Sequence, residues 1–172
     1  MGMSDLPVGD TCPSSGQSGA AMRIVVGSDH YGLDLKNVLK EYIEEQGHTC
    51  DDLGTHSHDP VDYPDIALQV AEDIAAGRHE RGILICGTGI GMAIVANKVP
   101  GVRAAQAHDV YSAERARKSN DAQIITLGSQ VIGPDLAKLL IDTWLRSEFA
   151  GGRSTRKVEK IKAIDERFRR RD

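Results

Sequence analysis

Five short runs of aliphatic and β-branched residues alternate along this chain with segments whose apolar residues recur every three or four positions. Two of the runs, residues 23–27 and 83–86, lack the polar alternation of a strand that has one face in water. Uninterrupted apolar runs of this length are typical of strands that are buried on both faces. Further strands are expected at residues 48–53, 102–108 and 124–128.

The segments between these runs have the pattern of amphipathic helices. Residues 35–43 carry apolar side chains at i, i+3, i+4, i+7 and i+8, and Gly47 is expected to end that helix. A second stripe follows Pro64, and further helices are expected at residues 111–118, 134–147 and 156–169. Because strands and helices alternate throughout, we predict an α/β fold, a Rossmann-like three-layer α/β/α sandwich around a five-stranded parallel sheet.

The domain organisation follows from composition and length. Residues 1–21 are rich in Gly, Ser, Pro and Asp and are expected to form a disordered leader. Residues 22–169 are expected to form a single domain that includes the C-terminal helix, with 170–172 as a tail. The last helix is strongly charged but places Val158, Ile161 and Phe168 near one face. We therefore expect it to dock on another surface, and a second subunit is one candidate.

Charge and hydropathy exclude several classes of protein. The formal net charge of −4 argues against a broad nucleic-acid interface. Neither a signal peptide nor an apolar run of about 18 residues is evident, so no membrane association is expected. Cys12, Cys50 and Cys86 show neither CxxC nor metal-ligand spacing. Reduced thiols and a cytoplasmic protein are the expectation.

Candidate functional residues come directly after the predicted strands. In an open parallel sheet, ligands bind beyond the carboxyl ends of the strands, so residues at these positions are expected to lie at one edge. They form four groups: Ser28-Asp29-His30, Gly54-Thr55 with Asp62-Tyr63, Cys86-Gly87-Thr88-Gly89-Ile90-Gly91, and His108-Asp109.

The glycine-rich group is the strongest local signal. Three alternate glycines between a strand and a helix allow backbone N–H groups to face an anion such as a phosphate or an enediolate. The same pattern also occurs in tight strand-to-helix turns that bind nothing. Cys86, at the end of the strand, could be a small buried apolar residue, or a base or nucleophile whose thiolate the adjacent N–H groups stabilise.

Other polar groups have structural and functional interpretations. Asp29 and His30 could be an ordinary loop pair or could bind a phosphate or a hydroxyl, and Arg153 could cap a helix or bind an anion. His56 and His58 lack a third ligand at metal-binding spacing, so no metal site is expected. Trp144, on a helical stripe, is expected to pack in the core. A Rossmann dinucleotide site is disfavoured on two grounds. Its third glycine would fall at Met92, and the glycine-rich motif follows the third strand of the domain, whereas a dinucleotide motif normally belongs to the first strand–helix unit.

Seven short motifs occur together and in order, and through them the chain resembles the type B ribose-5-phosphate isomerases, within the wider family that includes galactose-6-phosphate isomerase subunits. The motifs are Gly27-Ser-Asp-His30, Asp62-Tyr-Pro64, Ile85-Cys-Gly-Thr-Gly-Ile-Gly91, Ala96-Asn-Lys98, Tyr111-Ser112, Asn120-Asp121 and Gly151-Gly-Arg153. The resemblance spans residues 22–168. It implies an aldose–ketose isomerase that acts on a phosphosugar through a cis-enediolate, without a metal or other cofactor, in a homodimer with shared sites and possible further pairing to a tetramer.

The resemblance also implies roles for individual residues. Cys86 would move a proton between C1 and C2, with Thr88 near the reacting oxygens and the backbone of Gly87, Gly89 and Gly91 stabilising the enediolate. The implied substrate contacts are Asp29 and Tyr63 to the sugar, His30, Arg153 and Lys157 to the phosphate, and Asn120 of the partner subunit to the hydroxyls. We expect the thiol, the glycine turn and the phosphate-binding residues at one edge of the sheet.

Three departures from the family pattern bear on the substrate. Ser119 stands where many members have a histidine that assists ring opening, and His108 is a candidate for that role. Gln130 and Lys157 replace family arginines, with Arg156 displaced by one helical position. An open-chain four-carbon sugar phosphate, erythrose or erythrulose 4-phosphate, is therefore an alternative substrate to ribose 5-phosphate. A phosphosugar sensor on the same scaffold is a further alternative.

Overall fold

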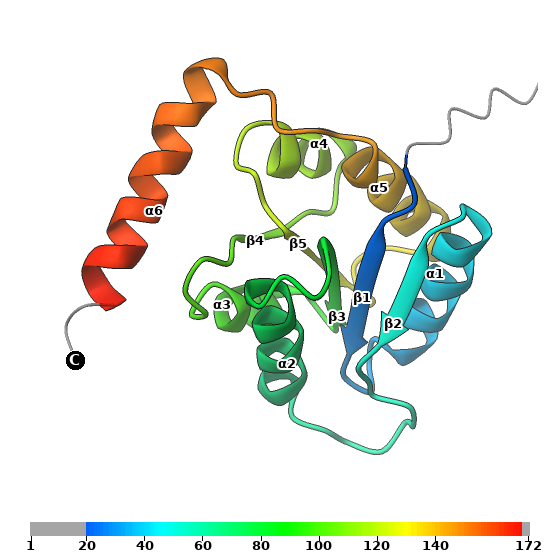
Figure 1. Ribbon diagram of the computed structural model, residues 1–172. Helices are drawn as coiled ribbons and strands as arrows, with labels where there is room; N and C mark the ends of the chain where they lie inside the picture. The colour runs from blue at the N-terminus through cyan, green and yellow to red at the C-terminus, as the bar shows by residue number, and fades with distance from the viewer. Residues whose placement is uncertain (1–19, 170–172) are drawn as a thin grey trace, which may run out of the picture.

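The computed structural model describes residues 20–169, which form one α/β unit (Figure 1). Its strands are β1 (Arg23–Ser28), β2 (Thr49–Asp52), β3 (Arg81–Cys86), β4 (Ala104–Gln106) and β5 (Ile124–Gly128). Its α-helices are α1 (Leu33–Glu45), α2 (Tyr63–Ala75), α3 (Ile90–Ala96), α4 (Val110–Lys118), α5 (Pro134–Leu145) and α6 (Thr155–Arg169), with a 3-10 turn, η1 (Gly152–Ser154), before α6. The predicted leader, apart from residues 20 and 21, and the predicted tail lie outside the described residues.

All five strands are parallel, in the order β2-β1-β3-β5-β4. The central strands β3 and β5 are buried along their whole length, which agrees for β3 with the uninterrupted apolar run of residues 83–86. The two edge strands are shorter than the 48–53 and 102–108 predicted from sequence, because a strand with one neighbour has fewer backbone partners to extend it. The chain crosses from β3 to the edge at β4 and returns to insert β5 between them.

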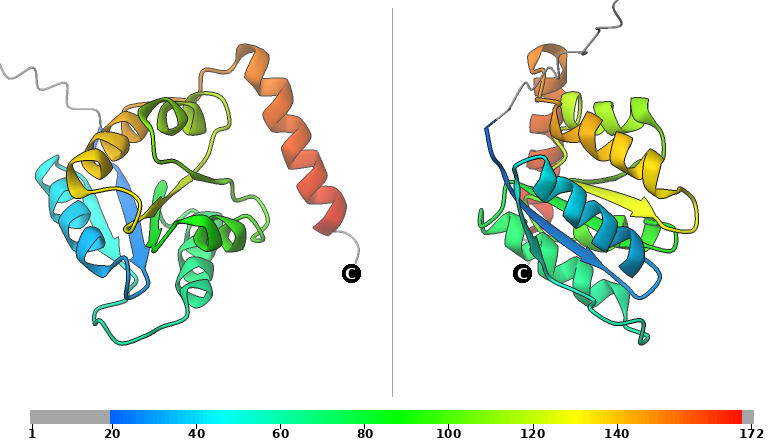
Figure 2. Two further views of the ribbon diagram at one scale, coloured as in Figure 1. Left: turned by 180° about the vertical axis from the view of Figure 1, so that it is seen from behind. Right: turned by 90° about the vertical axis from the view of Figure 1, so that its right-hand side faces the viewer.

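Two apolar cores fill the space on either side of the sheet. One packs α1, α4 and α5 against Ile24, Val26 and Ile83, and the fully buried Trp144 lies within it, as predicted. The other packs α2 and α3 against Val25 and Leu84. Helices therefore cover both faces, as Figure 2 shows from two further directions, and the predicted three-layer sandwich is confirmed.

Helix α6 differs from the other helices in having little of its surface packed. Figures 1 and 2 show it to one side of the sandwich, beyond α3 and β4. Val158 is its one buried residue within the described chain, whereas Ile161, Ile164 and Phe168 are exposed. Asp165 accepts a hydrogen bond from the Gly101 backbone N–H. The apolar stripe predicted for this helix thus lies largely in solvent in the single chain.

Candidate active site

A pocket of about 520 Å³ opens at the carboxyl edge of the sheet, at the point where the strand order reverses. Strand β2 pairs with one side of β1 and β3 pairs with the other side, so the order of the strands reverses at β1. Such a reversal leaves a crevice beyond the carboxyl ends of the strands. Residues that follow four of the five strands meet there: Asp29, Tyr31, Tyr63, Cys86, Gly87, Thr88, Ile90, Gly91, Ile94 and Gln130. The structure therefore brings together the predicted residues Asp29, Tyr63, Cys86 and Thr88.

The glycine-rich loop after β3 is fixed by hydrogen bonds to its carbonyl groups. The carbonyls of Cys86 and Gly87 accept from the backbone N–H groups of Ser129 and Gln130, at 2.9 and 3.1 Å. The next two carbonyls accept from side chains: that of Thr88 from Gln106 Nε2 at 2.7 Å, and that of Gly89 from the Thr126 hydroxyl at 2.8 Å. Four successive carbonyls are thus bound to β4, β5 and the residues after β5.

Cys86 ends β3 with its side chain only 5% exposed. Its Sγ accepts a hydrogen bond from the Gly89 N–H at 3.1 Å. Gly89 has φ of 77°, and a Cβ there would stand 2.9 Å from the Leu127 backbone, so glycine is required on both counts. This backbone conformation directs an N–H donor at the thiol sulfur, which is an interaction that stabilises negative charge on sulfur.

The opposite wall of the pocket comes from the residues after β1 and β2. Asp29 is 4% exposed, and its Oδ1 accepts from the Gly32 N–H at 3.0 Å. His30 is half-buried, and its Nδ1 accepts from the Val61 N–H at 3.3 Å. Tyr63 starts α2 and packs so closely on Gly91 that a Cβ at that position would lie 2.5 Å from its ring. Tyr63 therefore joins the two walls.

His108 lies one strand away from the thiol. Its Nε2 accepts from the Gly128 N–H at 2.8 Å, and Gly128 is the register partner of Cys86. This hydrogen bond assigns the ring proton to Nδ1. Burial lowers the pKa of His108, and the charge of Asp109 opposes that effect only in part. Both the lowered pKa and the accepting Nε2 favour the neutral ring of His108, which is not among the residues that line the pocket.

Three predicted site residues lie at the other edge of the sheet in the same chain. Asn120 follows α4, and its carbonyl accepts from Arg103, the residue that precedes β4. Arg153 is exposed in η1, and the nearby Ala150 N–H donates to the Lys118 carbonyl at the end of α4. Lys157 is exposed in the first turn of α6. The expectation that the phosphate-binding residues and the thiol share one edge is therefore wrong for Arg153 and Lys157 within a single chain, because α4 and α5 both run back to the amino ends of the strands; His30 does lie at the edge of the thiol.

As a result, one chain supplies the pocket with no cationic side chain. Among the residues that line it there is no Lys, Arg or His, and Gln130 is the lining residue that follows β5. A phosphate would be held there by backbone and neutral groups alone.

In residues 20–169, no three His, Cys, Asp or Glu side chains are placed to hold a metal ion, and His58 lies beside Asp34 at 3.3 Å. Within those residues, no helix combines the length and apolar character needed to cross a membrane.

Sequence reasoning missed the residues that support the loop. Thr126 is the one polar residue among the apolar residues of β5, and this interruption of the apolar run could have indicated a side chain with a hydrogen-bonding role. Gln106 and Ser129 gave no such signal, because their partners are fixed by the strand order. Lys36 is buried on α1, although the apolar stripe predicted for this helix does not include its position.

Comparison with known proteins gives a consistent result. Residues 24–161 match the family model described as ribose/galactose isomerase. A D-erythrulose-4-phosphate isomerase of Pectobacterium atrosepticum is 56% identical over 144 residues, covering 81% of this chain and 93% of that protein. A ribose-5-P isomerase B of Listeria innocua is 53% identical over 148 residues, covering 86% of this chain and 100% of that protein. The structure of Clostridium thermocellum ribose-5-phosphate isomerase B is 48% identical, with a TM-score of 0.84, over 86% of this chain and 99% of that one.

Proposed function

This chain belongs to the ribose/galactose isomerase family, and we propose that it interconverts ribose 5-phosphate and ribulose 5-phosphate, with the Cys86 thiolate as the base. The observation that carries this proposal is the buried thiol at the carboxyl end of β3, held 3.1 Å from the Gly89 N–H in a pocket at the sheet reversal. Free Cys50 and Cys86 thiols and a small phosphorylated substrate fit an enzyme of the reducing cytoplasm.

The proposed reaction moves one proton between neighbouring carbons. The thiolate takes the C2 proton of the open-chain aldose, and the electrons of the C–H bond form the C1–C2 double bond of a cis-enediolate while negative charge develops on O1. Return of the proton to C1, with transfer of the O2 hydroxyl proton to O1, gives the ketose and the free thiolate. Fixed N–H donors are most useful where this charge develops. The loop of residues 86–91 is suited to that role because its carbonyls are bound on the side of the sheet.

The remaining pocket residues would orient the sugar. Thr88 is exposed at the loop, and its Oγ1 accepts from the Ile90 N–H at 3.3 Å, which leaves its own proton available to a substrate oxygen. Asp29 and Tyr63 would bind the sugar hydroxyls from the opposite wall, and His30 would lie toward the phosphate. We further propose that His108 assists ring opening through its Nδ1–H. His108→Ala should then slow cyclic substrates more than open-chain ones, and equal losses in kcat/KM would contradict this role.

We propose that the working enzyme is a homodimer in which Asn120, Arg153 and Lys157 complete the partner's pocket. Two observations support this: the pocket of one chain has no cationic side chain, and these three residues lie at the opposite edge. Apolar residues at the pocket rim and on α6 are also exposed, namely Ile90, Ile94, Ile161 and Ile164. The family resemblance leaves further pairing to a tetramer possible, and the molecular mass in solution tests both states.

Mixing two inactive variants tests the shared site directly. Cys86→Ala and Arg153→Ala chains are each expected to have little activity alone. After unfolding and refolding together, random pairing would place both wild-type residues in one site of each mixed dimer, which gives roughly a quarter of wild-type activity. No recovery, from a mixture shown by mass to contain mixed dimers, would mean that Arg153 does not act across the interface.

A four-carbon sugar phosphate is the second candidate substrate. Two observations favour it: the 56% identical relative is named a D-erythrulose-4-phosphate isomerase, and Ser119 stands where many family members have histidine. A tetrose 4-phosphate cannot close a furanose ring through its phosphorylated oxygen, so it needs no ring opening.

Proton NMR in D₂O, without added cofactor, distinguishes the two substrates. Ribose 5-phosphate and erythrose 4-phosphate would be followed separately for ketose formation and for loss of the C2 proton signal. The sugar with the larger kcat/KM identifies the substrate class, and deuterium incorporation supports the enediolate route. Binding without proton exchange for either sugar would contradict the isomerase proposal and favour a phosphosugar sensor. Introducing the absent imidazole as Ser119→His should raise activity on ribose 5-phosphate if ring opening limits it.

A further inference from the structure

Lys36 is fully buried, yet it takes no part in the reaction proposed above. Its Nζ donates to both carboxylate oxygens of Asp52, at 2.6 and 2.5 Å, and to the Thr55 carbonyl at 2.8 Å. A lysine is rarely buried unless all its donors are paired, and here three acceptors meet its three N–H groups. The ion pair connects α1 to the end of β2 and to the loop that follows it.

The loop held by Lys36 is itself bound to the end of β1. The Gly54 N–H donates to Asp52 Oδ1 at 2.9 Å, so the carboxylate holds both the lysine and the loop backbone. The Ser28 N–H donates to the Gly54 carbonyl and the Thr55 N–H donates to the Ser28 carbonyl, both at 2.6 Å. Ser28 is the residue immediately before Asp29. A shift of this loop would therefore move the backbone that places the Asp29 carboxylate.

The main chain at the start of α1 holds Asp29 from the other side. The backbone N–H of residue 36 donates to the Gly32 carbonyl at 2.8 Å, and the Gly32 N–H donates to Asp29 Oδ1. Farther along the same loop, the Val61 N–H donates to His30 Nδ1, and Tyr63 begins the next helix. All three residues of the wall opposite the thiol are thus connected to the loop that the Lys36–Asp52 pair holds. Asp29 is connected through the hydrogen bonds of the neighbouring Ser28, His30 through the Val61 N–H, and Tyr63 through the chain itself.

We infer that the buried Lys36–Asp52 ion pair is a positioning device for the substrate-binding wall of Asp29, His30 and Tyr63, and that the hydrogen bonds that fix the catalytic loop of residues 86–91 do not depend on it. The carbonyls of the loop on the other wall are bound to β4, β5 and the residues after β5, and none of these four hydrogen bonds involves Lys36 or Asp52. The inference rests on the proposed function, because it assigns this wall to the sugar. It predicts that loss of the pair weakens substrate binding and spares the base.

Lys36→Met tests the inference, with Lys40→Met as a matched control. Lys40 lies one turn farther along α1 and pairs with Glu44 at the surface, so its loss should leave KM unchanged. For Lys36→Met, we expect KM to rise about tenfold, with kcat reduced by less than about threefold, as for a lost contact made equally in the ground and transition states. The substrate used is whichever sugar phosphate the wild-type enzyme converts faster, so the wild-type rate tests the proposed function and the variant ratio tests the inference.

Cysteine alkylation separates positioning from general loosening of the fold. Iodoacetamide labelling, mapped by mass spectrometry, should give the same rate at Cys86 in Lys36→Met as in the wild type. Cys50 is buried in β2, next to the Asp51-Asp52 segment, and burial raises its pKa to about 12, so it should stay unlabelled in both. Faster labelling of Cys50 would indicate local unfolding and would overturn a purely positional role.

A double variant keeps the test decisive if Lys36→Met does not fold. Lys36→Met/Asp52→Asn removes both charges together, which avoids an unpaired buried charge, while the asparagine oxygen can still accept from the Gly54 N–H. The expected result is again a raised KM with kcat largely kept. A wild-type KM in the folded double variant, or a loss confined to kcat, would overturn the inference.

Discussion

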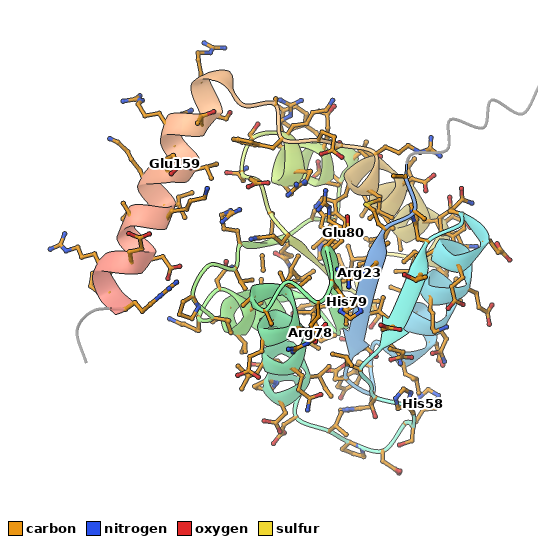
Figure 3. The ribbon with its side chains drawn as sticks, in the orientation of Figure 1. Arg23, His58, Arg78, His79, Glu80 and Glu159 are labelled. Atoms are coloured by element: carbon orange, nitrogen blue, oxygen red, sulfur yellow. The ribbon has the colours of Figure 1, made fainter. Side chains whose placement is uncertain are left out.

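At the amino edge of the sheet, charged side chains bind one another, whereas the polar side chains that form the pocket wall at the carboxyl edge bind backbone or face the pocket. At the amino edge, the His79 ring lies between the carboxylates of Asp73 and Asp51, and Arg78 also pairs with Asp73. Figure 3 shows Arg78 and His79 close to Arg23 and Glu80, and apart from His58 on the β2–α2 loop. At the carboxyl edge, the Asp29 side chain accepts from the Gly32 backbone N–H, and the His30 side chain accepts from the Val61 backbone N–H.

The difference shows which polar groups remain available to a ligand. A carboxylate already paired with a guanidinium or an imidazole contributes to stability, and its remaining capacity to bind a substrate is small. A carboxylate oriented by one backbone donor has further acceptor positions free. The comparison therefore predicts that substitutions of pocket residues at the carboxyl edge change activity with little change in stability, and that substitutions in the ion-pair cluster of the amino edge do the reverse.

The largest expected effect is at Cys86. Cys86→Ala should lower kcat by about 10³-fold or more, because the proton between C1 and C2 then has no base, while substrate binding and thermal unfolding change little. Steady-state kinetics, substrate binding by calorimetry and thermal denaturation check the three parts. Cys50→Ala is the control, since Cys50 is buried away from the pocket. Activity above a tenth of wild type in Cys86→Ala would remove the thiol from the mechanism.

The amino edge should give the opposite result at Asp73. Asp73→Asn is expected to lower the free energy of unfolding by about 2–3 kcal/mol, because His79 and Arg78 lose a charged and largely buried partner. The folded variant should keep wild-type kcat/KM. Denaturant unfolding measures the first effect and initial rates the second. Glu44→Gln, which breaks an exposed pair with Lys40, is the control and should change the free energy of unfolding by less than about 0.5 kcal/mol.

A smaller effect is expected where the two walls of the pocket touch. Gly91→Ala would place a Cβ 2.5 Å from the Tyr63 ring, so the ring must shift from its position in the pocket wall. We expect kcat/KM to fall by about tenfold, since a misplaced substrate contact costs on the order of 1.4 kcal/mol. Gly133→Ala is the control, because nothing lies within 4 Å of a Cβ at that position. Equal kinetics for the two variants would show that Tyr63 does not contact the sugar.

The smallest expected effect is the pH dependence of stability from Asp73. Burial alone would raise the pKa of this carboxyl, but hydrogen bonds from Arg78 and His79 outweigh burial and hold it below its usual range. Because the folded-state pKa is lower than the unfolded one, the contribution to stability is complete above about pH 4–5 and is lost as the pH falls through the folded-state pKa. Thermal denaturation of wild type and Asp73→Asn from pH 3 to pH 7 should show a difference that is constant above pH 5 and shrinks below it. A difference that already shrinks between pH 7 and pH 5 would point to a different group.

Much of the fold follows from the sequence, because strands buried on both faces and amphipathic helices have distinct periodicities. The lengths of the edge strands and the order of the sheet do not follow, since both depend on which strand each one pairs with. The same limit applies to the site. Cys86, Asp29 and Tyr63 are identifiable as residues that follow strands, whereas the roles of Thr126, Gln106 and Lys36 depend on partners 16 or more positions away.

The insertion of β5 between β3 and β4 also determines when the site can form during synthesis. The thiol and the glycine turn leave the ribosome early, but three of the four carbonyl partners of the turn come from Thr126, Ser129 and Gln130. Until that later segment has emerged, β3 has an unpaired edge, and its turn cannot be held in the arrangement seen here. A nascent chain would thus carry its reactive thiol for some time before acquiring the framework that directs it, and completion of the sheet would mark the onset of catalytic competence.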